Sequence, residues 1–290
     1  MRLSVIIVTW NSERYIGQCL DAVLAQDPGA EAIVVDNNST DRTGAILGSY
    51  GGRIRTIRND ANRGFAAATN QGLACVGGDY LLLLNPDAAP CPGAFAAMTG
   101  AMDADRRIGA LGPQLINPDG SIQPSCREFP RPVHCLYEFT GLAALFPRHP
   151  RFGSWRMGYF DHVSRREVDQ PMGACLMVRR TAADAAGSLD ERNFPMFFND
   201  VDWCTRIARA GWKIVFFPGA RVVHHRGVSV RQARLVMTAT SHLSFARFLC
   251  KHYGPSPAAL AAAALVMAAL PVRLVWQSAG VALAAVTGHE

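Results

Sequence analysis

The sequence lacks the features that mark several common protein classes. Its eight cysteines include no Cys-x-x-Cys pair, so a cysteine-based zinc cage is not expected. Several of them lie in apolar runs, as buried free thiols do, which indicates a reducing compartment. The N-terminal segment MRLSVIIVTWNS has one basic residue and no small-residue cleavage site, so it fits a first strand better than a signal peptide. The chain also has no internal repeat.

The overall composition allows a large core but says little about partners. The chain has 290 residues, and 49% of them are hydrophobic, which suits one large domain or a domain with an appendage. Lys and Arg number 29 against 23 Asp and Glu, a net charge of +6. This charge is compatible with phosphate-bearing partners or an anionic membrane surface, but it is also common in ordinary soluble proteins.

Apolar strands and amphipathic helices alternate in the N-terminal third of the sequence. The continuously apolar run 3–8 is typical of a strand covered on both faces. A helix follows it, with Asn11 and Ser12 as candidate caps. Its apolar residues have i, i+3, i+4, i+7, i+8 spacing: Ile16, Cys19, Leu20, Val23 and Leu24. Further strands are expected at 32–35, 54–57 and 80–84, and helices at 43–48 and 64–75. This order predicts βαβ units and a parallel sheet.

The pattern loosens beyond residue 115. Residues 117–165 are rich in proline, arginine and aromatic residues, and we expect loops, a hairpin or short helices there. Regular structure returns as a strand at 173–179, a helix at 201–210 and a strand at 213–217.

Polar side chains follow four of the expected strands. These strand ends carry Thr9 and Asn11, then Asp36, then Asn62 and Gly64, then Asn85 and Asp87. Each segment alone could be a simple turn, because Asn, Asp, Ser and Pro favour turns. Open α/β sheets, however, bind ligands beyond the carboxyl ends of their strands. All four together therefore predict one site at that edge of the sheet.

Four motifs in this order resemble a known family. VIIVTWNS, VVDNNSTD, NRGFAAATNQG and LLLLNPDA are similar to the successive motifs of family 2 glycosyltransferases with the GT-A fold, in particular the bacterial rhamnosyltransferase-like branch. The resemblance covers about residues 2–230. It implies a Rossmann-like, mostly parallel sheet flanked by helices, and an enzyme that uses a nucleotide-diphosphate sugar. No GxGxxG loop follows the first strand, which argues against a dinucleotide oxidoreductase.

The resemblance also assigns roles to the strand-end residues. The donor-binding residues that it implies are Thr9, Asn11, Asp36, Asn62, Gly64, Asn70 and Asn85. In this scheme, Thr9 and Asn11 line the nucleoside pocket and Asp36 hydrogen-bonds the base. Asp87 matches the last acid of the family's DxD-type motif and would bind Mg²⁺ or Mn²⁺ at the diphosphate, where a hard cation stabilises the leaving group. Asn85 stands in place of the first acid.

The stretch PMFFNDVDWCTR resembles the family's acidic motif that carries the catalytic base. Asp200 matches the base, although Asn199 replaces the usual acid before it. A carboxylate there would take the proton of the acceptor hydroxyl in one displacement, which inverts the anomeric carbon. Without the resemblance, Asp200 fits a helix N-cap. Asp202 is the alternative base and a candidate acceptor-binding residue, and it can also pair with Arg206 at i+4.

Two further segments resemble family elements. VVHHRGVS matches a late His-x-x-Gly-x-Ser element near the metal, with His224 at the matching position and His225 as the alternative. Arg226 or Arg231 could meet phosphate or form a solvated basic face. GACLMVRR is similar to the segment on the acceptor side, where Gly173 would let a sugar approach the backbone, although it could equally be a core strand.

The C-terminal segment 256–288 is apolar but interrupted by Pro271, Arg273 and Gln277. Its uninterrupted part is shorter than the roughly 20 residues that a membrane span requires, so a helix lying in the membrane interface is favoured over a span or a packed helix. We therefore expect a GT-A domain at 1–230 and a membrane-associated helical region at 231–290.

The expected function is transfer of a sugar, with rhamnose from dTDP-rhamnose as the first choice, to a cell-envelope glycan or lipid-linked acceptor. The expected location is the cytoplasmic face of the cell membrane, and no nucleic-acid partner is expected. The alternatives are a nucleotidyltransferase, for which TWNSERY offers no basic Gly-rich loop, and an inactive glycan-binding or scaffold protein. Intact Asp36, Asp87 and Asp200 argue against the latter.

Overall fold

The computed structural model describes residues 2–27, 29–225 and 234–287. The described residues fall into two compact units. Unit 1 comprises Met1–Phe129, Phe160–Pro195 and Asn199–Ser229, and unit 2 comprises Pro130–Tyr159, Met196–Phe198 and Val230–Glu290. Unit 2 thus combines the C-terminal segment with two earlier segments of the chain, and the division into domains at residue 230 stays a prediction.

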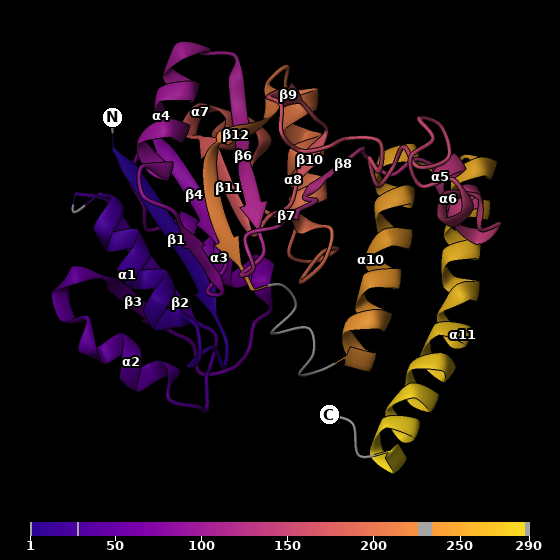
Figure 1. Cartoon of the computed structure of the whole chain (residues 1–290), viewed down its shortest axis with the longest axis horizontal. Helices are drawn as coiled ribbons and strands as arrows, with labels where there is room; N and C mark the ends of the chain where they lie inside the picture. The colour runs from indigo at the N-terminus through magenta and orange to yellow at the C-terminus, as the bar shows by residue number, and fades with distance from the viewer. Residues whose placement is uncertain (1, 28, 226–233, 288–290) are drawn as a thin grey trace. The chain divides into compact units, whose positions relative to one another are not determined.

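Unit 1 is built on a mixed sheet with the order β3-β2-β1-β4-β11-β6-β12-β5 (Figure 1). Short strands β7 and β9 pair with β6 and β12, and β8 pairs with β10 in a separate two-stranded sheet. The strands are β1 (Leu3–Thr9), β2 (Glu31–Asp36), β3 (Arg55–Arg58), β4 (Tyr80–Leu84), β5 (Ala88–Pro90), β6 (Ile108–Ile116), β7 (Ile122–Gln123), β8 (Cys126–Arg127), β9 (Arg166–Glu167), β10 (Gln170–Pro171), β11 (Cys175–Arg179) and β12 (Lys213–His224).

The helices of unit 1 connect and cover these strands. They are α1 (Ile16–Gln26), α2 (Thr43–Ser49), the 3₁₀ turn η1 (Gly51–Arg53), α3 (Phe65–Leu73), α4 (Ala94–Ala104), α7 (Arg180–Ala186) and α8 (Asn199–Arg209). Strands β1 to β4 are joined through helices and run parallel, as the sequence predicts. Strand β11 runs antiparallel to both β4 and β6, so the sheet is mixed beyond β4.

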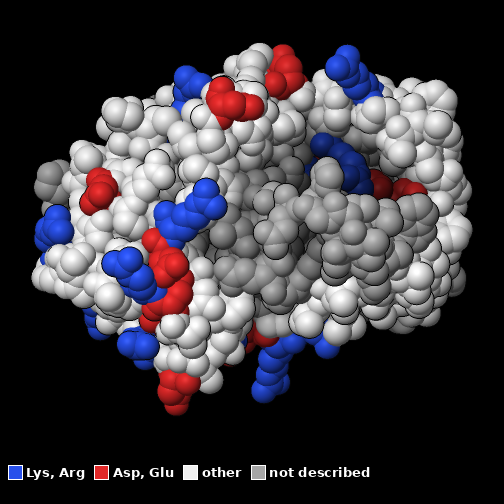
Figure 2. Space-filling view, turned by 60° about the horizontal axis from the view of Figure 1, so that its bottom comes forward, with Lys and Arg blue, Asp and Glu red and all other residues white. Residues whose placement is uncertain are grey.

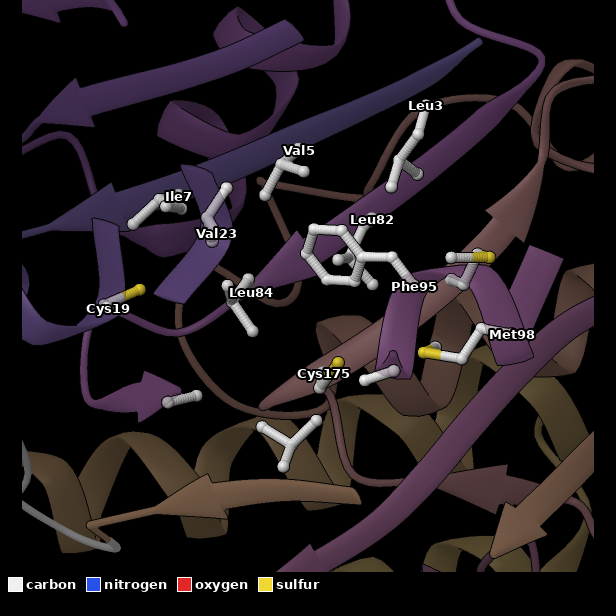
Figure 3. Packing of buried hydrophobic residues seen from close by; sticks show 14 of the residues in the cluster. Leu3, Val5, Ile7, Cys19, Val23, Leu82, Leu84, Phe95, Met98 and Cys175 are labelled. Atoms are coloured by element: carbon white, nitrogen blue, oxygen red, sulfur yellow. The ribbon is translucent and has the colours of Figure 1, made fainter. Parts of the chain in front are cut away.

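The core of unit 1 lies where α1 and α4 pack on the sheet. Figure 3 shows Val5 and Ile7 of β1 and Leu82 and Leu84 of β4 beneath side chains of these two helices. The apolar stripe predicted for α1 is confirmed, since Ile16, Cys19, Leu20 and Val23 are buried. Burial of each such side chain contributes about 1.5–3 kcal/mol, which fixes the central strands and hence the positions of their ends. All eight cysteines are free thiols in the structure.

The predicted capping of α1 is wrong. The helix begins at Ile16, and no side chain caps it. Asn11 instead has a left-handed backbone (φ +48°), and its side-chain oxygen accepts a hydrogen bond from the Thr40 N–H at 2.8 Å. Its amide is therefore used to hold the loop after β2 rather than the start of a helix.

Unit 2 consists of short helices α5 (Pro132–Phe139) and α6 (Leu142–Leu145) and long helices α10 (Arg234–Tyr253) and α11 (Pro257–Thr287). Its small core joins Cys135 of α5, Leu249 of α10 and Ala262 of α11. Phe198 stacks on Phe245 of α10, with ring centroids 5.0 Å apart. The expected short helices within 117–165 and the C-terminal helix are confirmed. Among the described residues, one stretch, Pro257–Val275, is long and apolar enough to cross a membrane, and 22% of it is buried.

Candidate active site at the carboxyl edge of the sheet

The ends of β1, β2 and β4 lie next to one another in unit 1, as predicted. Thr9 is paired in register with Asp36, and Ile7 with Leu84, so the residues that follow these strands share one edge (Figure 1). Figure 2 is seen from the side of these strand ends, and acidic and basic side chains are interspersed over its left half.

Two buried polar atoms at this edge have no hydrogen-bond partner among the described atoms: Thr9 Oγ1 and Asp36 Oδ2. Asp36 is 1% exposed, and its other oxygen accepts a hydrogen bond from the Ser39 N–H at 3.0 Å. Arg58 Nε is 3.7 Å from Oδ2, an ion pair too long to be a hydrogen bond. Leaving a buried carboxylate oxygen without a hydrogen bond costs free energy. Asp36 Oδ2 and Thr9 Oγ1 are therefore suited to receive a ligand N–H or O–H.

A network of amide side chains holds the loop between β3 and α3. Asn37 Nδ2 donates to Asn62 Oδ1 at 2.9 Å, and Asn62 Oδ1 also accepts from the Gly64 N–H at 3.0 Å. Asn59 and Gln71 exchange two hydrogen bonds of 2.9 and 3.0 Å. The sequence places Asn37 and Asn59 among the polar residues that follow β2 and β3 but assigns roles only to Asn62 and Gly64, and it does not single out Gln71.

Gly64 has a backbone conformation that favours glycine, with φ +84°. A Cβ atom there would also lie 3.1 Å from the Pro195 carbonyl oxygen. Glycine is therefore required at this turn for both conformation and space.

The Asn70 side chain forms hydrogen bonds with Leu189 and Glu191, which are far from it in the sequence. Its side chain exchanges hydrogen bonds with the backbone N–H and C=O of Leu189, both at 2.9 Å, and donates to Glu191 Oε2 at 3.0 Å. Asn70 thereby fixes the 189–191 loop. The structure thus places Asn70 at this loop, and a contact with the donor remains a prediction.

Asp87 and His224 come together where β12 pairs with β5. His224 Nε2 is 3.5 Å from Asp87 Oδ1, and the two side chains are almost fully buried. Gln123 Oε1 lies 2.7 Å from His224 Nδ1, and the Gln123 amide nitrogen donates to Asn117 Oδ1 at 2.8 Å. Gln123 therefore fixes the orientation of the His224 ring, so that the ring edge carrying Nε2 faces Asp87.

A divalent cation fits the Asp87 and His224 pair. The pair offers one carboxylate oxygen and one imidazole lone pair, a donor set that suits Mg²⁺ or Mn²⁺ when phosphate oxygens and water complete the shell. In the described part of the chain, no group of three or more Asp, Glu, His or Cys side chains gathers as a cation site. The cation would thus depend on the diphosphate for further ligands.

Backbone hydrogen bonds hold the residues next to Asp87 and His224. His225 donates its backbone N–H to the Asp87 carbonyl oxygen at 2.9 Å, and its ring packs on Tyr15. The Asn85 N–H donates to the Ala174 carbonyl oxygen at 2.9 Å, which ties the end of β4 to the start of β11. Arg226 and Arg231, and the Gly227 and Ser229 of the predicted element, lie outside the described residues.

Asp200 is held by three hydrogen bonds in the first turn of α8. Oδ2 accepts from the Gly173 N–H at 3.0 Å and from Gln170 Nε2 at 2.9 Å, and Oδ1 accepts from the Val201 N–H at 2.9 Å. Burial raises the pKa of Asp200, and these hydrogen bonds oppose that rise because they stabilise the carboxylate. A raised pKa suits a carboxylate that must accept a proton near neutral pH.

Gly173 was predicted to face the acceptor, and the structure places it directly against Asp200. A Cβ atom on residue 173 would lie 3.0 Å from both Cβ and Oδ2 of Asp200. Glycine therefore lets the backbone N–H reach the carboxylate. Gln170, the other donor, was not found from the sequence because it is 30 residues from Asp200.

Asp202 is placed differently. It is 0% exposed, and its Oδ2 accepts a hydrogen bond from Arg206 Nε at 2.9 Å, the i, i+4 pair that the sequence suggests. Arg206 in turn donates to the Ala186 carbonyl oxygen. This burial favours a structural role for Asp202 between α8 and the end of α7 rather than contact with an acceptor.

Comparisons with known proteins identify the family. Residues 4–162 match the family model for glycosyl transferase family 2. The chain is 32% identical over 265 residues to the N-acetylglucosaminyl-diphospho-decaprenol L-rhamnosyltransferase of Mycobacterium tuberculosis strain H37Rv, covering 87% of this chain and 85% of that protein.

Solved structures show the same fold. The mannosyltransferase PcManGT from Pyrobaculum calidifontis, in complex with GDP-Man and Mn²⁺, gives a TM-score of 0.59 at 20% identity over 100% of this chain and 76% of that one. Staphylococcus aureus TarS with UDP-GlcNAc gives 0.56 at 17% identity over 86% of this chain and 67% of that one. The chain therefore belongs to glycosyltransferase family 2 and has the GT-A fold, which confirms the resemblance seen in its four motifs.

Proposed function

We propose that this glycosyltransferase moves rhamnose from dTDP-rhamnose, with inversion, to a lipid-linked N-acetylglucosamine diphosphate at the cytoplasmic face of the membrane. The sugar and acceptor rest on the 32% identity to the mycobacterial rhamnosyltransferase over most of both chains. The observation that supports the chemistry is that Asp36 Oδ2 and Thr9 Oγ1, which have no hydrogen-bond partner, and the Asp87–His224 pair all lie at strand ends of one sheet.

The nucleotide would be recognised at the ends of β1 and β2. Asp36 Oδ2 is free to accept the ring N–H of a thymine or uracil base, and Thr9 Oγ1 is free to pair with a neighbouring polar atom of the nucleoside. The amide network around Asn37 keeps the 59–64 loop in place before the ligand arrives. A loop that is already ordered reduces the entropy loss that binding must overcome.

The diphosphate would lie at Asp87 and His224. A divalent cation held there supplies charge stabilisation for the diphosphate leaving group. Gln123 keeps the His224 ring oriented, and the backbone N–H of His225 donates to the carbonyl oxygen of Asp87. Asn85 occupies the position of a second acid without adding negative charge.

Asp200 would act on the acceptor. Its carboxylate accepts the proton of the attacking hydroxyl, and the N–H groups of Gly173 and Val201 and the Gln170 amide fix its orientation. Because attack by the hydroxyl and departure of the diphosphate occur in one displacement, the configuration at the anomeric carbon inverts. Asp202 supports this helix through Arg206.

The C-terminal helix α11 would bring the enzyme to its lipid-linked acceptor. Its apolar stretch Pro257–Val275 is long enough to enter a bilayer, and few of its side chains are buried within the protein. Pro271 and Arg273 interrupt the stretch, which favours a position in the membrane interface over a full span.

Calorimetric binding of UDP, GDP and dTDP, with and without Mg²⁺ or Mn²⁺, tests the proposal. We expect dTDP to bind in a metal-dependent manner and Asp87→Ala to lose the metal dependence while the protein stays folded. Transfer to a lipid-linked N-acetylglucosamine diphosphate, measured by product mass, then tests the acceptor. Binding of no nucleotide by the folded protein would refute the proposal, and tighter binding of UDP or GDP would refute the assigned donor.

A further inference from the structure

The charge of the chain is distributed unevenly between its two units. Unit 1 contains 20 Lys and Arg against 21 Asp and Glu, whereas unit 2 contains nine against two. The net positive charge of the protein therefore comes from unit 2 alone. A strongly basic unit joined to a neutral one indicates an anionic partner for that unit.

Exposed apolar side chains are distributed in the same way. Of the 14 large apolar side chains that are exposed in the described part of the chain, 13 lie in unit 2 and one, Val163, lies in unit 1. Eight of the 13 are on α10 and α11. The other five are on and beside α5 and α6: Val133, Leu136, Phe139, Leu145 and Phe146.

Helix α5 has one packed face and one open apolar face. His134, Cys135 and Tyr137 are buried, and Cys135 packs on α10 and α11. Val133, Leu136 and Phe139 have i, i+3, i+6 spacing, which places them within about 120° of one another around the helix. Phe139 is 60% exposed and Leu145, at the end of α6, is 72% exposed. Such large apolar side chains on a surface mark a contact with another apolar phase.

The segment that carries this open face is also basic. We define the α5–α6 segment as residues 131–156. It contains four exposed arginines, Arg131, Arg148, Arg151 and Arg156, and one acid, Glu138. Arg156 forms a bidentate pair with Glu138 at 2.6 and 2.7 Å and also lies over the Trp155 ring. Aromatic and aliphatic side chains with arginines around them match the headgroup region of an anionic bilayer.

A second copy of the chain fits this surface less well. Two α5–α6 segments facing each other would bring together eight arginines and two glutamates, and this repulsion opposes association. Unit 1 of a second copy is neutral and, in its described part, has a single exposed large apolar side chain to offer. An anionic lipid surface supplies both the charge and the apolar phase.

We propose that the α5–α6 segment is a second membrane contact, separate from α11, which inserts Leu136, Phe139 and Leu145 into the interface and binds anionic headgroups through its arginines. The inference rests on the membrane location in the proposed function and adds a lipid preference to it. It gives unit 2 two points of attachment, so that the protein is held at the bilayer by more than its last helix.

Vesicle binding of the full chain tests the proposal. The variant L136E/F139E and the control V163E, which places the same charge at the exposed apolar site in unit 1, are mixed with phosphatidylcholine vesicles with or without phosphatidylglycerol. We expect the wild type and V163E to prefer the anionic vesicles, and L136E/F139E to bind them at least tenfold more weakly. Equal binding by all three folded proteins would overturn the proposal.

Hydrogen exchange gives a readout that strong binding by α11 cannot mask. In the full-length wild type, anionic vesicles should slow exchange of the amides at 139–149, and neutral vesicles should do so less. No change in this segment would overturn the proposal. The proposal would also be overturned if light scattering detected a dimer that L136E/F139E dissociates while vesicle binding stays unchanged. Nucleotide binding is measured on the same samples, so failure of the donor site is distinguished from failure of the membrane contact.

Discussion

The hydrogen bond from Gln170 to Asp200 allows the catalytic base to be tested through pH. Gln170 Nε2 donates to Asp200 Oδ2 at 2.9 Å, and this bond stabilises the carboxylate but not the protonated acid. Gln170→Leu removes the donor and keeps an apolar side chain of similar size. Burial already raises the pKa of Asp200, so loss of the donor raises it further.

The size of the expected pKa shift follows from the negative charge on the Asp200 carboxylate, which accepts the hydrogen bond. A hydrogen bond to a charged group contributes about 1.5–3 kcal/mol, and each pH unit corresponds to about 1.4 kcal/mol. The acidic limb of the pH–kcat/KM profile should therefore move up by roughly one to two pH units in Gln170→Leu. Activity falls at low pH, where the base is protonated, and recovers as pH rises above the new pKa.

A matched control separates this effect from general damage. Gln114 is also buried, and its amide donates to the His162 carbonyl oxygen at 2.7 Å. Gln114→Leu should lower stability but leave the acidic limb in place. Asp200→Asn should remove the limb and reduce kcat about 10²–10⁴-fold. An unmoved limb in Gln170→Leu, with both glutamine variants folded, would refute Asp200 as the base.

Four other predictions concern the donor site, the metal pair, the core and the tail. Asp36→Asn should weaken nucleotide binding about 10–100-fold by calorimetry, and an unchanged Kd would contradict its role. Gln123→Leu should weaken metal-dependent nucleotide binding about tenfold or more but not metal-free binding, because the His224 ring loses its orientation; equal losses would argue against this. Gly72→Ala places a Cβ 2.5 Å from an Ile6 methyl group and should cost about 1–3 kcal/mol by thermal unfolding, while Gly100→Ala meets nothing within 4 Å and should not destabilise. A chain that ends at residue 253 should bind membranes more weakly than the full chain, although the α5–α6 segment still attaches it, and an unchanged distribution between the membrane and soluble fractions would count against membrane association by α11.

The strands and their ends could be predicted from the sequence because local patterns determine them. Strand β4 was predicted with its observed bounds, since its five residues are uniformly apolar and Pro86 follows soon after. Asp36 stands directly after such a run and Asp87 follows one after Asn85 and Pro86, and the family resemblance then predicts their roles. A strand buried on both faces needs a continuous run of apolar residues. A ligand site needs polar side chains at the carboxyl ends of such strands.

The partners of these residues could not be predicted in the same way. Gln123 contacts His224 across 101 positions of sequence, and Gln170 contacts Asp200 across 30. Neither glutamine lies in a motif, and a glutamine in a short strand has no distinguishing local pattern. The direction of β11 was missed for a related reason, because the pattern of an apolar strand does not encode whether its neighbour runs parallel or antiparallel.

The net charge shows how a whole-chain average can hide a strong signal. A value of +6 is unremarkable in 290 residues, but it is the sum of a unit at −1 and a unit at +7. The basic segment 130–159 lies in the middle of the sequence, far from the apolar C-terminal helices, and only the fold joins it to them. Once they are joined, the arginines of the α5–α6 segment and the exposed apolar side chains of α11 belong to one body. Charge and apolar exposure then point to the same partner, a lipid surface, where a lipid-linked acceptor would be found.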